Sequence, residues 1–438
     1  MPARLKINFF TPLPPLRTSI ADHSARLLKA LGELADVTAW TDQKDWDELG
    51  LDGVTVQRFD DSTAPSRFHI ADLSFYNLGN NYPFHGKIYE IARRFPGIVI
   101  IHDPNMGYFF GSAADSPEGR HRYLQFVGRH YGPAALDEAL NVFAGKARLD
   151  KVMLRYPMTE AALEGALGAL VHHEALQQTL SESTGLPIFY TPLSHSERAT
   201  RSATTDTPPF KLITFGYLGS NRRLDDIAKA LSTFPKRDQF TWDIYGTVQV
   251  TGAARRLLKS KVGSRIRIHD FVEEEVLDKA ISEANLAINL RNPTMGEASS
   301  SQLRIWEYGV PSLVSRVGWY AAQPHDTVFF VDPGDEINGI QRYLADFLRD
   351  PATFKAAGER GRAYLNQVHG TRRYAQALVN ITAQSTELHA KAGSLRAAAG
   401  ATHTFADMAG LDSLTSHIPK LAEAVYSLTN AKNGEPPT

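Results

Sequence analysis

The chain has 438 residues, of which 43% are hydrophobic and 22% are charged, and these proportions exclude a disordered or fibrous protein. Lys and Arg together number 47 and Asp and Glu 48, so the net charge of -1 excludes a global electrostatic field that would gather nucleic acid. The absence of cysteine excludes disulfides, thiolate nucleophiles and cysteine metal sites.

Short β-rich segments alternate with helical patterns along the first half, which is the order expected of a parallel sheet covered by helices on both faces. The run IVIIHD predicts a strand buried on both faces, and its polar end should open onto the ligand side of the sheet. The predicted strands are 5–10, 36–41, 54–59, 98–103, 166–174 and 186–194, with helices over 20–34 and most of 111–165, broken at Gly132-Pro133 and Pro157.

The segment 194–209, SHSERATRSATTDTPP, is polar, rich in Ser and Thr and ends in proline, which is a linker composition. After it the alternation restarts, with predicted strands at 211–218, 240–246, 266–272, 286–291, 311–315 and 329–331 and helices at 224–234, 252–260, 274–284, 299–308 and 335–348.

This restart predicts two α/β domains facing a central cleft, which is the default place for a site. We expect an N-terminal Rossmann-like domain over 1–195, a linker over 196–209 and a C-terminal Rossmann-like domain over 210–350. Residues 351–385 are expected to form helices that pack back towards the N-terminal domain, and 386–438 a helical tail.

Several common motifs are absent from the sequence. There is no GxGxxG after the first strand, no GxxxxGK[ST] and no HExxH, so no nicotinamide, P-loop nucleotide or metal site is predicted. The acidic pair in DWD (45–47) lies in a charged stretch and is interpreted as a solvated loop. No apolar stretch reaches the about 18–20 residues that span a bilayer, and prolines interrupt the N-terminal apolar run, so we expect a cytoplasmic protein.

Three groups of residues could carry chemistry. His102 ends the buried strand IVIIHD, where a histidine can hydrogen-bond a ligand or merely cap a loop. The segment FGYLGSNRR (215–223) joins a strand to a helix through a glycine turn with two arginines, which suits a diphosphate, although an exposed basic turn is the simpler alternative. In RNPTMGEASSS (291–301), Glu297 precedes a predicted helix that the following serines can cap, and the N–H groups at the start of this helix would face the cleft. The alternative is that Glu297 itself only caps the helix.

Taken together, these segments resemble the retaining glycosyltransferases of the GT-B fold, in glycosyltransferase family 4 (glycosyl transferases group 1). The resemblance covers about residues 5–385, and its most specific part is the last segment. The matching segments are FFTPLPP with TSIADHSARLLKAL, YNLGNN with His85, PGIVIIHD, RYPMTEAALEGALGALVHHE, FGYLGSNRRLDDIAKAL and NLRNPTMGEASSSQLRIWEYGVPSLVSRVGW.

The resemblance implies a fold of two Rossmann-like domains and a metal-independent hexosyltransferase, with a nucleotide-diphosphate sugar as co-substrate and no other cofactor. It implies a glycan, lipid-linked or other cell-envelope acceptor, polysaccharide biosynthesis and weak association with a membrane surface; it implies no nucleic acid. His102 and Glu297 match the catalytic residues that contact the donor sugar. The implied donor-binding residues are Ser19, Gly216, Arg222, Arg223, Gly296, Ala298, Ser299, Ser300 and Arg304.

The sequence departs from the family pattern at three positions. Arg304 stands where a second glutamate usually binds the ribose, Tyr217 where an arginine is common, and Ser19 where a glycine is common. Glu307 lies three residues beyond Arg304 and is expected on another face of the helix. These departures keep open a catalytically silent GT-B scaffold or partner subunit, and a GT-B sugar-nucleotide epimerase is the third alternative.

Overall fold

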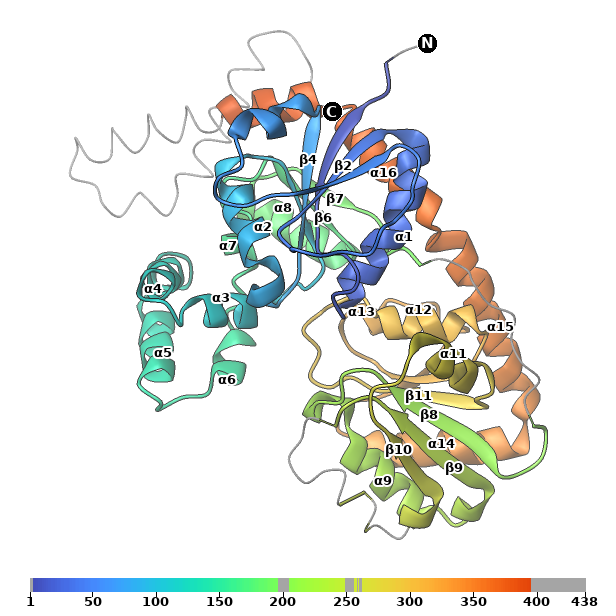
Figure 1. Ribbon diagram of the computed structural model, residues 1–438. Helices are drawn as coiled ribbons and strands as arrows, with labels where there is room; N and C mark the ends of the chain where they lie inside the picture. The colour runs from blue at the N-terminus through green and yellow to red at the C-terminus, as the bar shows by residue number, and fades with distance from the viewer. Residues whose placement is uncertain (1–2, 196–204, 249–255, 258, 260–261, 395–438) are drawn as a thin grey trace, which may run out of the picture. The chain divides into compact units, whose positions relative to one another are not determined.

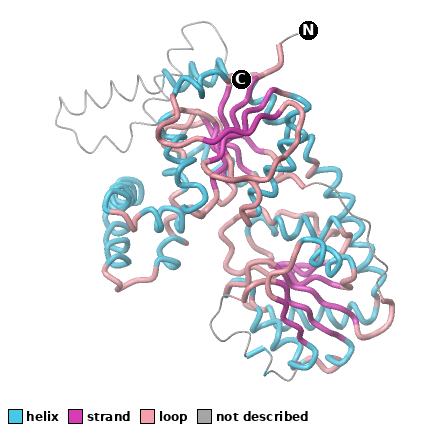
Figure 2. The backbone as a smooth tube through the Cα atoms, in the orientation of Figure 1, coloured by secondary structure: helices cyan, strands magenta, loops and turns pink. Residues whose placement is uncertain are grey.

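The computed structural model describes residues 3–195, 205–248, 256–257, 259 and 262–394. The chain divides into two compact units, one comprising Met1–Pro192 with Thr371–Thr438 and the other Leu193–Gly370. Each unit is an α/β structure built on its own sheet (Figures 1 and 2).

The first unit contains a seven-stranded sheet in which all neighbouring strands run parallel, in the order β3-β2-β1-β4-β5-β6-β7. The chain order reverses between β1 and β4, and in open parallel sheets the crevice at such a point binds ligands. The strands are β1 (Lys6–Phe10), β2 (Asp36–Thr41), β3 (Val54–Arg58), β4 (Leu73–Leu78), β5 (Ile98–Ile101), β6 (Gly168–Val171) and β7 (Ile188–Tyr190), with a 3-10 turn at Pro65–Ile70.

Helices cover both faces of this sheet because successive residues of a strand point to opposite faces. Phe9 lies in the core formed with α1 (Ser19–Leu34) and α16 (Thr371–Thr382), whereas Phe10 lies in the core formed with α2 (Tyr82–Arg94). Although α16 follows the whole second unit in the sequence, it belongs to the first unit and packs beside α1 (Figure 1).

The connection from β5 to β6 is long and folds into a helical arm. Within the arm α3 packs on α2, and α4, α5 and α6 pack on one another beyond it (Figure 1). The predicted helical breaks are confirmed: α5 begins at Pro133, and Pro157 lies between the end of α6 at Met153 and the start of α7 at Thr159. The helices are α3 (Gly107–Ala113), α4 (Pro117–Tyr131), α5 (Pro133–Phe143), α6 (Leu149–Met153) and α7 (Thr159–Ala162), followed after β6 by α8 (Glu174–Thr184).

The second unit contains a six-stranded parallel sheet in the order β10-β9-β8-β11-β12-β13. Here the chain order reverses between β8 and β11, which creates a second crevice of the ligand-binding kind. The strands are β8 (Phe210–Phe215), β9 (Phe240–Tyr245), β10 (Ile266–His269), β11 (Leu286–Asn289), β12 (Ser312–Ser315) and β13 (Phe329–Val331).

The same alternation places the helices of the second unit on two faces. Leu212 packs with α9 and α14, and its neighbour Ile213 packs on the opposite face, where α11 and α12 lie. The helices are α9 (Leu224–Thr233), α11 (Glu274–Ser282), α12 (Ser300–Glu307), α13 (Gly318–Ala321), α14 (Glu336–Arg349) and α15 (Pro351–Val368), with 3-10 turns at Ser220–Arg222, Arg237–Gln239 and Gly263–Arg265.

The two ends of the second unit are tied together. His195 forms a parallel bridge with Gly370 and donates its backbone N–H to the carbonyl of His369 at 2.8 Å. The His195 ring also lies 2.7 Å, from Nε2 to Oε2, from the buried carboxylate of Glu307 on α12. The segments that enter and leave this unit are therefore anchored to α12.

The α/β fold class predicted from the alternation is confirmed, with one strand missed. Leu73–Leu78 was not predicted as a strand because Ser74 and Asn77 interrupt its apolar run. The predicted helix 252–260 and linker 196–209 lie largely outside the described residues, as does the tail beyond residue 394. Of the expected C-terminal helices, α15 belongs to the second unit and α16 to the first. None of the described helices is long and apolar enough to span a membrane.

Candidate functional site

Arg222 is the central residue at the crevice of the second unit. It follows β8 and is only 2% exposed. Its guanidinium donates from Nη1 to Oδ1 of Asn289 at 2.6 Å and from Nε to the carbonyl of Tyr217 at 3.2 Å. Burial, followed by the nearby charge of Arg291, lowers the pKa of Arg222 to about 9. The alternative of an exposed basic turn is therefore wrong for this residue.

A chain of buried amides holds Asn289 in place. Asn289 ends β11, and its Nδ2 donates to Oε1 of Gln302 on α12 at 3.0 Å. Gln302 in turn donates from Nε2 to the hydroxyl of Ser312 on β12 at 2.8 Å. Because all three side chains are buried, the acceptor atom that faces Arg222 is fixed by packing as well as by hydrogen bonds.

Gly216 allows the chain to turn beside Arg222. Its φ is +106°, which favours glycine, and a Cβ built there would lie 3.0 Å from Nη2 of Arg222. A side chain at this position would press on the guanidinium. The predicted importance of Gly216 thus has a steric basis in the structure.

Glu297 lies in the turn after β11 and is 15% exposed. One oxygen of its carboxylate forms an ion pair with Arg291, and the other accepts the backbone N–H of Met295 at 3.0 Å. Gly296, with φ +86°, allows the turn to bring the carboxylate back onto this N–H. One carboxylate oxygen of Glu297 therefore stabilises the turn in which the residue lies, and the other is paired with the guanidinium of Arg291.

Other predicted donor-binding residues surround the start of α12. Ser299 caps the helix by accepting the backbone N–H of Gln302 at 3.1 Å, and it also accepts the hydroxyl of Tyr320 at 2.7 Å. Ala298 is partly buried and Ser300, the first residue of α12, is exposed. The backbone N–H groups of the first turn of α12 give this end of the helix a positive partial charge.

Arg223 is engaged differently from its neighbour. Its Nε lies 2.8 Å from a carboxylate oxygen of Asp226 and 3.4 Å from one of Glu336. Two carboxylates thus already neutralise Arg223, whereas the described residues give Arg222 no ion pair with a carboxylate. Of the two predicted arginines, Arg223 is thus the one that is ion-paired in the described part of the chain, and Arg222 is held by neutral oxygens.

Arg304 points to α11 and binds acidic groups there. Its Nε donates to Oδ1 of Asp278 at 2.7 Å, and Nη2 lies 3.6 Å from a carboxylate oxygen of Glu274. Glu307 bonds instead to His195, so the two side chains have different partners. The structure gives Arg304 a role in holding α11 against α12.

His102 lies in the first unit, directly after β5. Its Nε2 lies 2.9 Å from Oδ1 of Asn77, and its ring packs near those of His23 and His172. Burial lowers its pKa well below the ordinary value, and the neighbouring histidines lower it further. Because an amide oxygen only accepts, Nε2 carries the proton and Nδ1 is the acceptor.

Ser19 also belongs to the first unit. It is the first residue of α1 and is exposed, and the preceding Thr18 caps the helix by accepting the backbone N–H of Ala21 at 3.0 Å. The loop that leads into α1 follows β1, at the point where the chain order of the sheet reverses. Among the described residues, no group of three or more His, Cys, Asp or Glu side chains is arranged to hold a metal ion.

Sequence reasoning missed three residues that shape these sites. Asn289 orients Arg222, Asn77 orients His102 and Arg291 pairs with Glu297. The available signal was a lone asparagine near the end of an otherwise apolar strand, in LAIN and in LSFYNL. A buried amide needs hydrogen-bond partners, so such a residue can be recognised as the support of a nearby polar group.

No family model matches the sequence, and no curated protein matches it. Solved structures with a similar fold include sucrose-phosphate synthase from Thermosynechococcus elongatus, with TM-score 0.60 and 17% identity over 87% of this chain and 99% of that one. Anabaena HepE in complex with UDP and glucose matches with TM-score 0.58 and 12% identity over 86% and 99%. WaaG, a glycosyltransferase of lipopolysaccharide biosynthesis, matches with TM-score 0.54 and 12% identity over the same shares. The chain has the GT-B fold, as predicted.

Proposed function

We propose that this protein is a retaining glycosyltransferase of family 4 that transfers a hexose from a nucleoside diphosphate sugar to another molecule. The observation that carries the proposal is Arg222, a buried guanidinium that pairs with no carboxylate among the described residues. Because an uncompensated buried charge is costly, such a group is best explained by an anionic ligand. The structures of HepE with UDP-glucose and with UDP support a nucleoside diphosphate as that ligand.

The charges at the crevice suit a departing diphosphate. With a pKa of about 9, Arg222 is protonated at neutral pH, and the start of α12, where Ser301 lies 3.5 Å from the guanidinium, adds positive partial charge beside it. Fixed positive charge stabilises the transition state where the leaving group gains negative charge. We therefore propose that the transfer needs neither a metal ion nor another cofactor.

Glu297 is the proposed partner of the donor sugar. Its carboxylate is held by Arg291 and by the backbone of its own turn, so it is oriented before a ligand arrives. An oriented carboxylate accepts hydrogen bonds from sugar hydroxyls without a large entropic cost. The acceptor then attacks on the face from which the diphosphate leaves, and a phosphate oxygen takes the acceptor's proton, so we assign no protein base.

His102 is the second proposed contact of the donor sugar. Its low pKa keeps the imidazole neutral at pH 7, and its Nε2 proton is directed to Asn77. The unprotonated Nδ1 is then suited to accept a hydrogen bond from a sugar hydroxyl. A neutral ring adds no positive charge at the anomeric carbon, where positive charge develops as the diphosphate departs.

The acceptor and location belong to the same proposal. We propose a glycan, lipid-linked or other cell-envelope acceptor, weak association with a membrane surface, and a cytoplasmic location, the last on the absence of cysteine. A catalytically silent scaffold is the second candidate, because Arg304 replaces the carboxylate expected at the ribose and is paired with α11.

Donor binding and turnover test the proposal together. The thermal unfolding midpoint is measured with millimolar UDP-glucose, GDP-mannose and dTDP-glucose, because a ligand that binds only the folded state raises the midpoint. We expect one donor to raise it and to release its nucleoside diphosphate in the presence of a cell-envelope extract. Binding without release, or no shift with any of the three donors, would contradict the transferase and favour the scaffold, whose ribose carboxylate is replaced by Arg304.

A further inference from the structure

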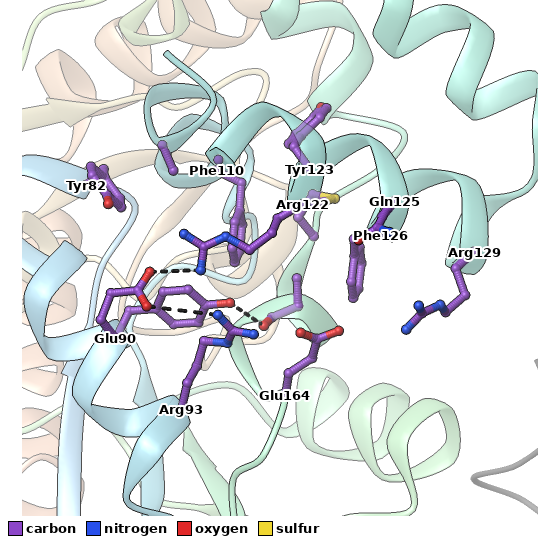
Figure 3. A pocket seen from close by; sticks show the side chains of 15 residues that line it. Tyr82, Glu90, Arg93, Phe110, Arg122, Tyr123, Gln125, Phe126, Arg129 and Glu164 are labelled. Atoms are coloured by element: carbon purple, nitrogen blue, oxygen red, sulfur yellow. Dashed lines mark hydrogen bonds and ion pairs between the residues drawn. The ribbon is translucent and has the colours of Figure 1, made fainter. Parts of the chain in front are cut away.

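The helical arm and α2 of the first unit enclose a pocket of about 220 Å³ (Figure 3). Its walls come from α2, α3 and α4 and from the chain around α7. The pocket exists because the long connection between β5 and β6 folds back along α2. At this size it is smaller than a site for a drug-sized ligand and is suited to a group of about one ring.

The floor of the pocket is aromatic. Four rings from α2, α3 and α4 contribute to it, and each of these residues is between 3% and 8% exposed: Tyr89, Phe110, Tyr123 and Phe126. The hydroxyl of Tyr89 donates to the carbonyl of Ala161 at 3.2 Å, which fixes its ring against α7. The small part of these rings that remains exposed offers apolar contact to the C–H face of a ligand ring.

The rim of the pocket is charged. Glu90 on α2 lies between two arginines, with Arg122 at 3.0 Å and Arg93 at 3.9 Å from its carboxylate oxygens (Figure 3). The three side chains are 33% to 44% exposed. The single negative charge of Glu90 is thus shared by the guanidinium groups of Arg93 and Arg122, so their two positive charges are only partly neutralised.

A third arginine extends this rim. Arg129 lies on α4 one helical turn beyond Gln125, so both line the same side of the pocket. Figure 3 shows its guanidinium beside the pocket with no hydrogen bond to the other lining side chains, and the described residues give it no ion pair. With Glu164 as the second carboxylate, the lining carries three cations and two anions, an excess of one positive charge.

We propose that this pocket binds an acidic sugar ring, such as a uronate unit of a glycan. The aromatic floor accepts the C–H face of the ring, and Gln125 can bond its hydroxyls. Arg129 forms the bidentate contact to the carboxylate, since a planar guanidinium matches two carboxylate oxygens. That the ring belongs to the acceptor glycan rests on the proposed function, whereas binding of the ring itself does not.

Calorimetric titration of the full chain with tetragalacturonate, without nucleotide, tests this site. Maltotetraose serves as the neutral comparison, and Arg129→Gln removes the guanidinium. The matched control is Arg94→Gln, because Arg94 lies on α2 and is exposed but does not line the pocket. We expect tetragalacturonate to bind the parent and the control, Arg129→Gln to weaken this binding by about tenfold or more, and maltotetraose to bind at least about tenfold more weakly than tetragalacturonate.

Equal affinity for the acidic and the neutral tetrasaccharide would overturn the proposal, as would equal losses in the Arg129 and Arg94 variants or no binding of tetragalacturonate at millimolar concentration. Both arginines are exposed, so both variants are expected to fold, and their unfolding midpoints verify this. Because nucleotide is left out, failure here is separate from failure of the donor site. Uronate binding in a protein that binds no nucleotide sugar would contradict only the glycosyltransferase proposal.

Discussion

Arg222 donates a hydrogen bond of 2.6 Å to the side-chain oxygen of Asn289, and both side chains are buried. An amide oxygen orients the guanidinium without forming an ion pair with it. A carboxylate at the same position would compete directly with a phosphate ligand. Because residue 289 is an asparagine and not an aspartate, the guanidinium of Arg222 can bind an anion without first breaking an internal ion pair.

Asn289→Asp tests this reasoning. The new carboxylate should form an ion pair with Arg222 and lower the affinity for the nucleoside diphosphate by about tenfold or more. The free nucleoside lacks phosphate oxygens, so its affinity should not change. Calorimetric titration with the diphosphate and the nucleoside measures both, and an unchanged diphosphate affinity would count against an anion site at Arg222.

Glu297→Gln should lower the turnover rate by about 100-fold, or about 3 kcal/mol of transition-state stabilisation, while the fold persists. The amide keeps the shape of the side chain but loses the charge that orients sugar hydroxyls. Glu275→Gln on the exposed side of α11 is the matched control and should keep full turnover. Equal rates in the two variants would exclude Glu297 from the reaction.

Glu307 is predicted to stabilise the second unit through His195. Their side chains are 4% and 9% exposed, and Glu307→Ala leaves the buried imidazole without its acceptor. The loss should lower the free energy of unfolding by about 3 kcal/mol. Glu307→Gln keeps an acceptor oxygen and should cost about 1 kcal/mol. Denaturant titration measures both, and equal small losses would show that the bond contributes little.

Stability should fall as the pH drops below neutrality. Burial lowers the pKa of His85 in the first unit from its ordinary value of 6.5 to about 4. The unfolded chain therefore binds a proton that the folded chain does not, so this contribution is complete above pH 6.5 and is lost as the pH falls to about 4. At full loss it amounts to about 3 kcal/mol. Denaturant unfolding between pH 4 and 7 measures the slope, which should decrease in His85→Gln.

Periodicity predicted the two sheets well because buried parallel strands are short apolar runs separated by amphipathic helices. It failed at Leu73–Leu78, where Asn77 serves His102 and breaks the apolar pattern. The site was predicted through residues that the resemblance marks, including Arg222 and Glu297. Asn289, which supports Arg222, reaches it because β8 and β11 become neighbours in the folded sheet, and no local pattern carries that information. Arg291 pairs with Glu297 across a turn of only six residues, and its role was missed although the contact is local.

The two adjacent arginines show the same limit of prediction from sequence. Arg222 and Arg223 look equivalent in the sequence, yet one is buried against an amide and the other is neutralised by Asp226 and Glu336. Arg223 also differs in its backbone, with a positive φ of 56° just before α9. Sequence alone assigns both to the phosphate, and the structure separates them.

Binding of UDP and uridine to Arg222→Met and Arg223→Met is the most direct test of the anion site. If the buried guanidinium of Arg222 holds the diphosphate, Arg222→Met should lower UDP affinity by about 100-fold and leave uridine affinity unchanged, whereas Arg223→Met should change UDP affinity by less than about threefold. If the thermal unfolding measurements show binding of GDP-mannose or dTDP-glucose instead of UDP-glucose, the corresponding nucleoside diphosphate and nucleoside replace UDP and uridine. Equal losses of UDP affinity in the two variants, or a loss of uridine affinity as large as that of UDP in Arg222→Met, would contradict the account.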